Sequence, residues 1–265
     1  MLIDTHCHLD ASEFDTDRSH VAMQAIQQGV SKIVIPAVAR DNFDTVIALC
    51  NQHQHCAYAL GIHPMYVDKA IPQDIATLKM YVEKYKPVAI GEIGLDYFLT
   101  KANIEVQTYF FTEQLKIAKT YDLPVILHVR HAVDDVLKYL RRYEIKSGIA
   151  HAFNGSFQQA EQFIGLGFKL GFGGAMTYSR ALKIRELAAK LPLEAIVLET
   201  DSPDIPPEWL GTGGRNTPLE LPKIAQVLAD LRGINVSEVL ENTSANALKI
   251  LPKLLDLCTP PHLLL

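Results

Sequence analysis

Two histidines separated by a single residue stand near the amino terminus, in the run IDTHCHLD. Residues two apart in a β-strand project from the same face, so Asp4, His6 and His8 would share one face there. Neighbouring imidazoles at the end of a strand are typical of a metal site. A second pair, His53 and His55, lies among amides at the end of a helical pattern, and solvated histidines are the simpler interpretation of that pair.

Further residues of ligand type end or follow short apolar runs. They are His63 in GIHP, Glu92 in GEIGLDY, His128 in LHVR, His151 in AHAF and Asp201 in LETDSP. Imidazole and carboxylate side chains bind Zn²⁺, Mn²⁺ or Mg²⁺. Because so many ligands exceed what one tetrahedral ion uses, we expect two divalent ions bridged by a carboxylate.

Aliphatic runs alternate along the chain with segments of helical periodicity. Eight runs predict strands, near 2–7, 32–38, 57–62, 87–93, 124–129, 147–152, 168–172 and 195–200. Their starts lie roughly 28 residues apart, as in a (β/α)₈ barrel. We therefore predict an α/β fold, a single-domain TIM barrel over residues 1–265, with eight βα units over about 2–202 and covering helices over about 217–256. A doubly wound open sheet is the alternative, but no GxGxxG follows the first strand.

A barrel would place these side chains together, because active sites form at the carboxyl ends of its strands. The amino-terminal histidine pair and Asp201 would share one ion, since the last strand returns to the first. Two later histidines would hold the other ion, and Glu92 would bridge. Paired ions lower the pKa of a bound water, for which Asp201 is the natural general base, while Asp4 and Asp96 would orient ligands. The predicted catalytic residues are Asp201 and Glu92, and the predicted ligands are His6, His8, Glu92, His128, His151 and Asp201.

Two glycine-rich loops follow the last two predicted strands, at 171–174 and 211–216. Such loops are a frequent phosphate site in barrels because glycine lets backbone N–H groups approach the anion. Simple turn chemistry explains the glycines equally well. Arg215, within the second loop, and Arg130, two residues after His128, are candidate contacts to a substrate anion.

Composition excludes some classes of protein. The 265 residues carry a formal net charge of −5, which excludes a broad electrostatic clamp on nucleic acid. Two divalent ions would offset most of that charge where a phosphate docks. Four cysteines without a CxxC pair, an acidic amino terminus and no long apolar run predict a cytoplasmic protein without a membrane span. No obligate protein partner is evident.

In their order along the chain, the motifs IDTHCHLD, GIHP, GEIGLDY, LPVILHVR, HAFNGS, LETDSP and RNTP resemble the TatD family of metal-dependent hydrolases, many of them described as deoxyribonucleases. The segments GFGGAMTYSRA and LETDSPDIPPE are most similar to the YjjV branch of this family. The resemblance implies the same six metal ligands, with Glu92 as the bridge, and places His63 near the substrate phosphate. Departures such as Val129 and His131 remove none of the ligands.

The leading functional hypothesis is a two-metal phosphodiesterase that trims DNA ends as a 3′–5′ exodeoxyribonuclease, engaging them weakly and non-processively. An amidohydrolase acting on a small amide or cyclic amide is the alternative, because related barrels use a similar HxH and strand-end aspartate. In many of those barrels a modified lysine bridges the metals after the fourth strand, where this chain has Glu92. A non-catalytic metal-binding barrel is a third hypothesis, but it would not need the full ligand set together with Asp201.

Overall fold

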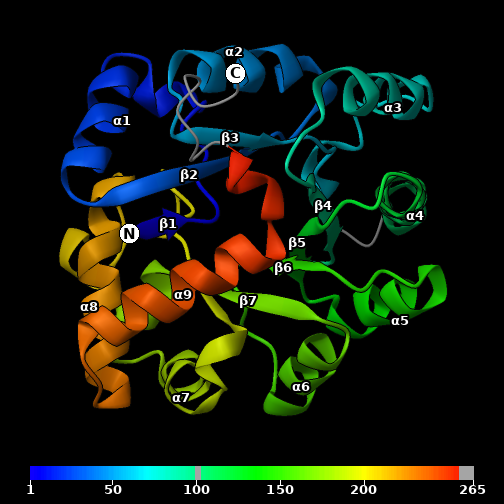
Figure 1. Ribbon diagram of the computed structural model, residues 1–265. Coiled ribbons are helices and arrows are strands. Elements are labelled where there is room, and N and C mark those ends of the chain that lie inside the picture. The colour runs from blue at the N-terminus through cyan, green and yellow to red at the C-terminus, as the bar shows by residue number, and fades with distance from the viewer. Residues whose placement is uncertain (99–102, 257–265) are drawn as a thin grey trace.

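Eight parallel strands follow one another around a closed ring, with helices outside it (Figure 1). The computed structural model describes residues 1–98 and 103–256. The strands are β1 (Leu2–Asp4), β2 (Val30–Pro36), β3 (Cys56–Ala59), β4 (Ile90–Asp96), β5 (Val125–Arg130), β6 (Gly148–Ala150), β7 (Phe168–Phe172) and β8 (Ile196–Leu198). Strands β1 to β3 pair in chain order in one sheet and β4 to β8 in a second. Single bridges from Leu60 to Ile90 and from Cys7 to Ser202 join the two sheets and complete the ring. The predicted (β/α)₈ barrel is therefore confirmed.

The helices form the outer layer of the barrel. They are α1 (Arg18–Gln27), α2 (Phe43–Gln52), α3 (Gln73–Tyr85), α4 (Ile104–Thr120), α5 (Val133–Tyr143), α6 (Phe157–Gly165), α7 (Leu182–Lys190), α8 (Leu221–Arg232) and α9 (Val236–Ile250). Ser156 caps α6, since its hydroxyl accepts the Gln159 N–H while the Gln159 side chain accepts the Ser156 N–H. Gly29 and Gly167 follow the ends of α1 and α6, and both have a φ of 89°. Glycine adopts this left-handed conformation without strain because it has no β-carbon.

Helix α9 closes the amino-terminal end of the barrel. The Ser244 hydroxyl donates to the Met1 carbonyl, and the Asn246 amide donates to the carbonyls of Leu193 and Ile196. Beneath the helix lies a separate apolar cluster formed by residues of the barrel interior and of the α9 end, including Ile3, Val34, Ala59, Ile126, Ile149, Val197, Ile250 and Leu254. In Figure 1 the helix crosses in front of the strands. The interior is therefore sealed at this end, and a site can open only at the other.

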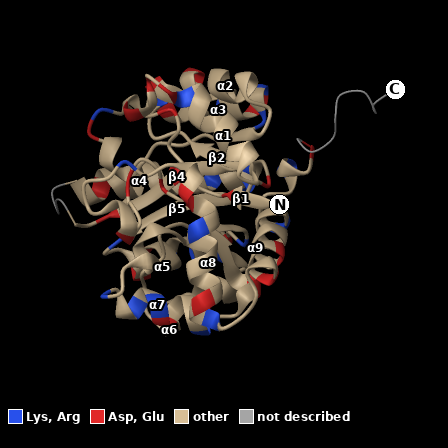
Figure 2. Ribbon diagram, turned by 90° about the vertical axis from the view of Figure 1, so that its left-hand side faces the viewer, with Lys and Arg blue, Asp and Glu red and all other residues tan. Residues whose placement is uncertain are grey.

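Charged residues of both signs cover the outer helices. In the view of Figure 2, lysines and arginines are interspersed with aspartates and glutamates, and no wide basic area stands out. This distribution agrees with the formal net charge of −5. None of the helices in the described part of the chain is long and apolar enough to cross a lipid bilayer.

Candidate metal centre

Seven side chains of ligand type converge at the carboxyl ends of the strands, opposite α9. They are His6, His8, His63, Glu92, His128, His151 and Asp201, and they form three overlapping groups whose ligand atoms lie within 4.8 Å of one another. Glu92 and His128 belong to β4 and β5, and the other five follow the ends of their strands. The structure thus brings together all six predicted metal ligands and His63.

Glu92 lies at the middle of this cluster, and only 2% of it is exposed. Its Oε2 atom is 3.1 Å from His6 Nε2 and 3.3 Å from His8 Nε2. Asp201 completes this side, with Oδ1 3.5 Å from His6 Nε2 and 3.7 Å from His8 Nε2. One oxygen of Glu92 therefore faces the group formed by the first strand and Asp201.

The other oxygen of Glu92 faces a different group. Its Oε1 atom is 2.9 Å from His151 Nε2, 3.1 Å from His128 Nδ1 and 3.3 Å from His63 Nε2. A carboxylate whose two oxygens face separate sets of imidazoles has the arrangement required to bridge two cations. The imidazole and carboxylate donors fit two divalent ions of the Zn²⁺ or Mn²⁺ type.

Asp201 turns back toward the cluster through an unusual backbone conformation. Its φ is 57°, in the left-handed region that aspartate tolerates better than most residues. Its N–H donates to the His6 carbonyl over 2.8 Å, which fixes the loop after β8 against the loop after β1. Asp4 supports the same junction, because its buried carboxylate accepts bonds from the Thr200 N–H and hydroxyl. Burial raises the pKa of Asp4 to about 7.

Burial and charge pull the pKa values of the cluster apart. For Glu92, burial is outweighed by the surrounding imidazoles, which hold the pKa of its carboxyl well below the usual range. For His8, burial is outweighed by the hydrogen bond and charge of Glu92 and by Asp201, and its pKa rises to about 9. Burial raises the pKa of Asp201 to about 6 against the opposing effect of the histidines. The glutamate is thus permanently charged, and cations and protons compete for the groups around it.

Hydrogen bonds on the far side of each ring indicate which nitrogen is free for an ion. His128 Nε2 lies 2.9 Å from Asp96 Oδ2, so its N–H points to the carboxylate and Nδ1 is left for a cation. His63 differs, because its Nδ1 accepts the Met65 N–H over 3.1 Å. The proton of neutral His63 is then on Nε2, facing Glu92, which suits donation to an anion better than binding to a cation.

Glu199 is a member of the site that sequence reasoning missed. It is 1% exposed, and its Oε1 atom lies 3.7 Å from His151 Nδ1 while accepting the Ala152 N–H. His151 Nδ1 and Glu199 Oε2 have no hydrogen-bond partner although both are buried. A β-carbon on Gly171 would lie 2.1 Å from Glu199 Oε2, so this glycine makes room for the carboxylate. The prediction of a loop at 171–174 is wrong at its start, because Gly171 and Phe172 pair with β8 as the end of β7. The sequence could have indicated Glu199, because it stands two positions before Asp201 and residues two apart in an extended chain project to the same side.

Replacing Glu199 by alanine should weaken metal binding at the His151 side by about 10- to 100-fold, the usual cost of losing a carboxylate that orients a ligating histidine. The substitution removes the buried carboxylate 3.7 Å from His151 Nδ1, whose charge favours the proton on Nδ1 and leaves Nε2 for the ion. Titration of chelator-stripped protein with Zn²⁺ by calorimetry measures the change. Glu194→Ala, a substitution on the same stretch before β8, is the control, and an unchanged affinity in Glu199→Ala would contradict the assignment.

The two predicted arginine contacts lie in different surroundings. Arg130 ends β5 beside Asp96 in the strand register, at the edge of the cluster. Arg215 lies farther out, where its guanidinium donates to both Asp17 oxygens, at 2.9 and 2.6 Å, and to the Glu13 carbonyl. Arg215 can reach a substrate anion only if this ion pair opens.

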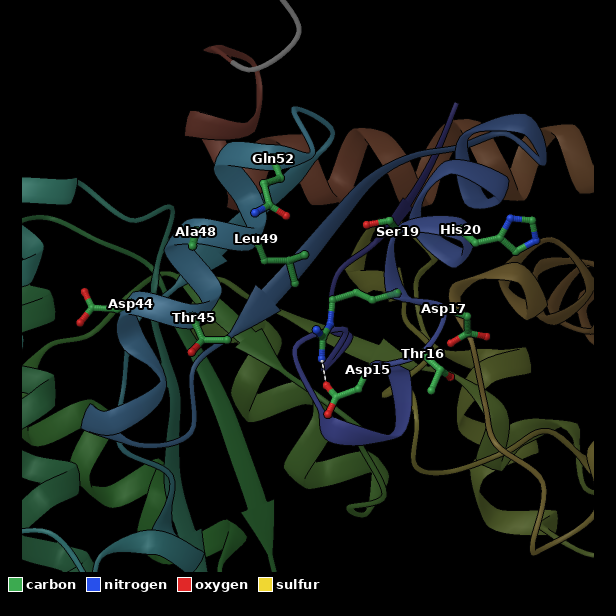
Figure 3. Close-up of a pocket in the computed structure, with 11 residues that line it drawn as sticks. Asp15, Thr16, Asp17, Ser19, His20, Asp44, Thr45, Ala48, Leu49 and Gln52 are labelled. Atoms are coloured by element: carbon green, nitrogen blue, oxygen red, sulfur yellow. Dashed lines mark hydrogen bonds and ion pairs between the residues drawn. The ribbon is translucent and has the colours of Figure 1, made fainter.

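A separate hollow of about 760 Å³ lies between α1 and α2. Figure 3 shows its lining, where Arg18 donates to Asp15 over 2.7 Å. None of the seven converging side chains lines this hollow. It is a groove on the outside of the barrel, separate from the metal-ligand cluster.

Comparison with known proteins agrees with the ordered motifs. The sequence model of the TatD-related DNases matches residues 3–252. The chain belongs to the TatD-related DNase family. Within this TatD family, it is 43% identical to the metal-dependent hydrolase YjjV of Escherichia coli K12, over 90% of this chain and 93% of that protein.

A crystal structure of YjjV and one further relative support the assignment. The crystal structure of YjjV from Escherichia coli superimposes with a TM-score of 0.90 at 41% identity, covering 95% of this chain and 98% of that one. TATDN3 of Mus musculus, whose name carries the word deoxyribonuclease, is 32% identical over 97% of this chain and 90% of its own. The predicted resemblance to the TatD family, and to YjjV within it, is therefore confirmed.

Proposed function

We propose that this TatD-family chain is a metal-dependent phosphodiesterase that hydrolyses DNA from strand ends, as a 3′–5′ exodeoxyribonuclease. The observation that carries the proposal is that the two carboxylate oxygens of Glu92 face different histidines. Oε2 faces His6 and His8, and Oε1 faces His128 and His151. A bridging carboxylate is the ligand that a two-metal hydrolytic site needs. The family and the names of its relatives support DNA as the substrate.

The residues would hold two ions in two sets that share Glu92. The first set is His6, His8 and Asp201, and the second is His128 and His151. Two divalent ions, when bound, supply a strong nucleophile at neutral pH and positive charge for the phosphodiester oxygens. Asp96 orients His128 by accepting the N–H of its Nε2 atom. Glu199 places a buried carboxylate 3.7 Å from His151 Nδ1, which favours the proton on that nitrogen and leaves Nε2 for the ion.

Asp201 acts as the general base of the reaction. Its carboxylate lies beside His6 and His8, 13% exposed at the open end of the barrel. Its pKa of about 6 leaves it ionised and basic near neutral pH. It accepts a proton of the attacking water as the water oxygen forms a bond to phosphorus. The phosphorus–oxygen bond to the deoxyribose on the opposite side breaks, and that oxygen takes up a proton from solvent.

His63 and Arg130 position the phosphate. His63 presents an Nε2 proton toward the centre of the site because Met65 occupies its Nδ1 atom. Arg130 adds a guanidinium at the end of β5, which pairs well with phosphate oxygens. Arg215 could join them only through a rearrangement of its pair with Asp17.

A metal-titrated assay tests the proposed function. Chelator-stripped protein is reloaded with Zn²⁺, Mn²⁺ or Mg²⁺ and given single-stranded DNA, duplex DNA, RNA and a panel of small amides. We expect metal-dependent release of nucleotides from DNA, and 5′-labelled strands that shorten stepwise establish 3′–5′ polarity. Cleavage of the amides alone would replace the proposal by the amidohydrolase alternative.

A further inference from the structure

An exposed aromatic ring stands at the edge of the metal-ligand cluster. Phe98 follows β4, and 53% of it is exposed. The Arg130 guanidinium carbon lies 3.6 Å from the centroid of its ring, so the cation covers one face. The His131 ring lies 5.5 Å away at a tilt of 59°. More than half of this large apolar side chain therefore remains open to solvent although a cation and an imidazole flank it.

The ring is tied to the metal-ligand cluster through one carboxylate. The Phe98 N–H donates to Asp96 Oδ1 over 2.9 Å, and Asp96 Oδ2 lies 2.9 Å from His128 Nε2. The same buried side chain thus fixes a predicted metal ligand and the backbone of the exposed phenylalanine. Phe98 is held at a defined position beside the site, which a freely placed surface ring would not be.

Arg130 has no competing acidic partner that would explain its placement. Among residues 1–98 and 103–256, no carboxylate oxygen lies within 4.0 Å of its guanidinium nitrogens, whereas Arg215 is paired with Asp17 over 2.6 Å. Arginine stacked on an aromatic face keeps its N–H groups in the plane of the guanidinium, free to donate to an anion. The pair therefore offers an apolar face and a cation within one short segment.

We propose that Phe98 is a stacking platform for the nucleobase of an unpaired strand end, with Arg130 contacting the adjoining phosphate. This inference rests on the proposed function and names its substrate class as single-stranded or frayed DNA ends. Every nucleobase has a π-face, so aromatic stacking binds a strand without reading its sequence. A chain with a net charge of −5 and interspersed surface charges gains little from phosphate contacts away from the metal centre, so stacking on Phe98 would add binding energy outside the metal site. A base paired inside a duplex end is already stacked and cannot occupy the platform.

Oligonucleotides that differ only in their terminal bases test the platform. One is a twelve-residue single strand of thymidylate, and the other has an abasic residue at each end, so that the polarity of cleavage does not matter. KM and kcat are measured for the metal-loaded wild type, Phe98→Ala, Phe98→Tyr and Tyr109→Ala. Tyr109 is a similarly exposed ring, 41% accessible, on α4, and metal content is determined for every variant.

For the wild type we expect a KM about 5- to 100-fold lower for the strand with terminal bases, the range that one base–aromatic stack provides. Phe98→Ala should lose this preference with kcat and metal content little changed, whereas Phe98→Tyr and Tyr109→Ala should retain it. A preference that persists in Phe98→Ala with full metal content overturns the platform.

Anisotropy of internally labelled versions of the two strands separates this inference from the proposed function. If no DNA is hydrolysed with any metal but Phe98→Ala loses base-dependent binding, the platform holds and the proposed function fails. If the wild type binds both strands equally, the platform is overturned whatever the hydrolysis assay shows.

Discussion

Replacing Glu92 by alanine should remove most of the bound metal and lower kcat/KM on DNA by at least about 10³-fold. That loss is the upper end of what removing a single charge-stabilising group costs a hydrolytic site. We expect it here because the two carboxylate oxygens face different histidine sets, so one substitution takes a ligand from both ion sites. It also removes the buried negative charge that offsets two cations among neutral imidazoles.

Metal analysis after gel filtration checks the Glu92 prediction, with about two ions per chain expected in the wild type. Glu186→Ala is the matched control, since that glutamate is exposed on α7 and forms a surface ion pair with Lys190. Its metal content and activity should equal those of the wild type. Retention of two ions by Glu92→Ala would remove the bridging assignment, and loss of one ion alone would restrict Glu92 to one site.

Replacing Asp201 by asparagine should remove nearly all hydrolysis while the fold remains intact. Asparagine has the same shape and keeps the backbone bond to the His6 carbonyl, but it cannot accept a proton from the attacking water. General-base catalysis contributes about 10²- to 10⁴-fold to a hydrolytic rate, and we expect a fall of that size or more because Asp201 also faces an ion site. Circular dichroism and thermal unfolding verify the fold.

The pH dependence of kcat/KM distinguishes a general base from a ligand of the ion. Asp201 acts only when ionised, so activity should fall as the pH drops through its pKa, which is about 6 without ions and lower beside bound cations. The residual activity of Asp201→Asn should lack this acid limb. Asp204→Asn, three residues farther along and exposed, serves as the control with normal turnover. Wild-type turnover in Asp201→Asn would exclude the proposed role.

The barrel and its convergence point could be predicted because both depend on local patterns. Strands alternate with helices at a regular spacing, and ligand-type residues such as His128 and His151 end or follow apolar runs. Parallel strands bring such ends to the same edge of a barrel. The six ligands therefore meet in the structure as the topology requires, and their role in metal binding stays a prediction.

The surroundings of those ligands depend on tertiary contacts that no local pattern records. Arg215 pairs with Asp17, which lies 198 positions away in the sequence. The motif around Arg215 therefore predicted a positive charge in the loop but could not predict that an aspartate neutralises it. The tautomer of His63 follows from a single bond to Met65 N–H. Glu199 is identified as a site residue only by its proximity to His151 Nδ1. Residues that hold others in place are found by packing, whereas ligands are found by type and position.

The closure of the barrel by α9 also determines the route of exchange. In the described part of the chain, Asn246 and its neighbours cover one end of the barrel at the strand termini, so substrate reaches the centre from the opposite end. A strand end that enters cannot thread through, and a released nucleotide leaves by the path through which the shortened strand must return. If the proposed function holds, product and substrate use the same opening and cannot occupy it together. Free mononucleotide should therefore act as a competitive inhibitor.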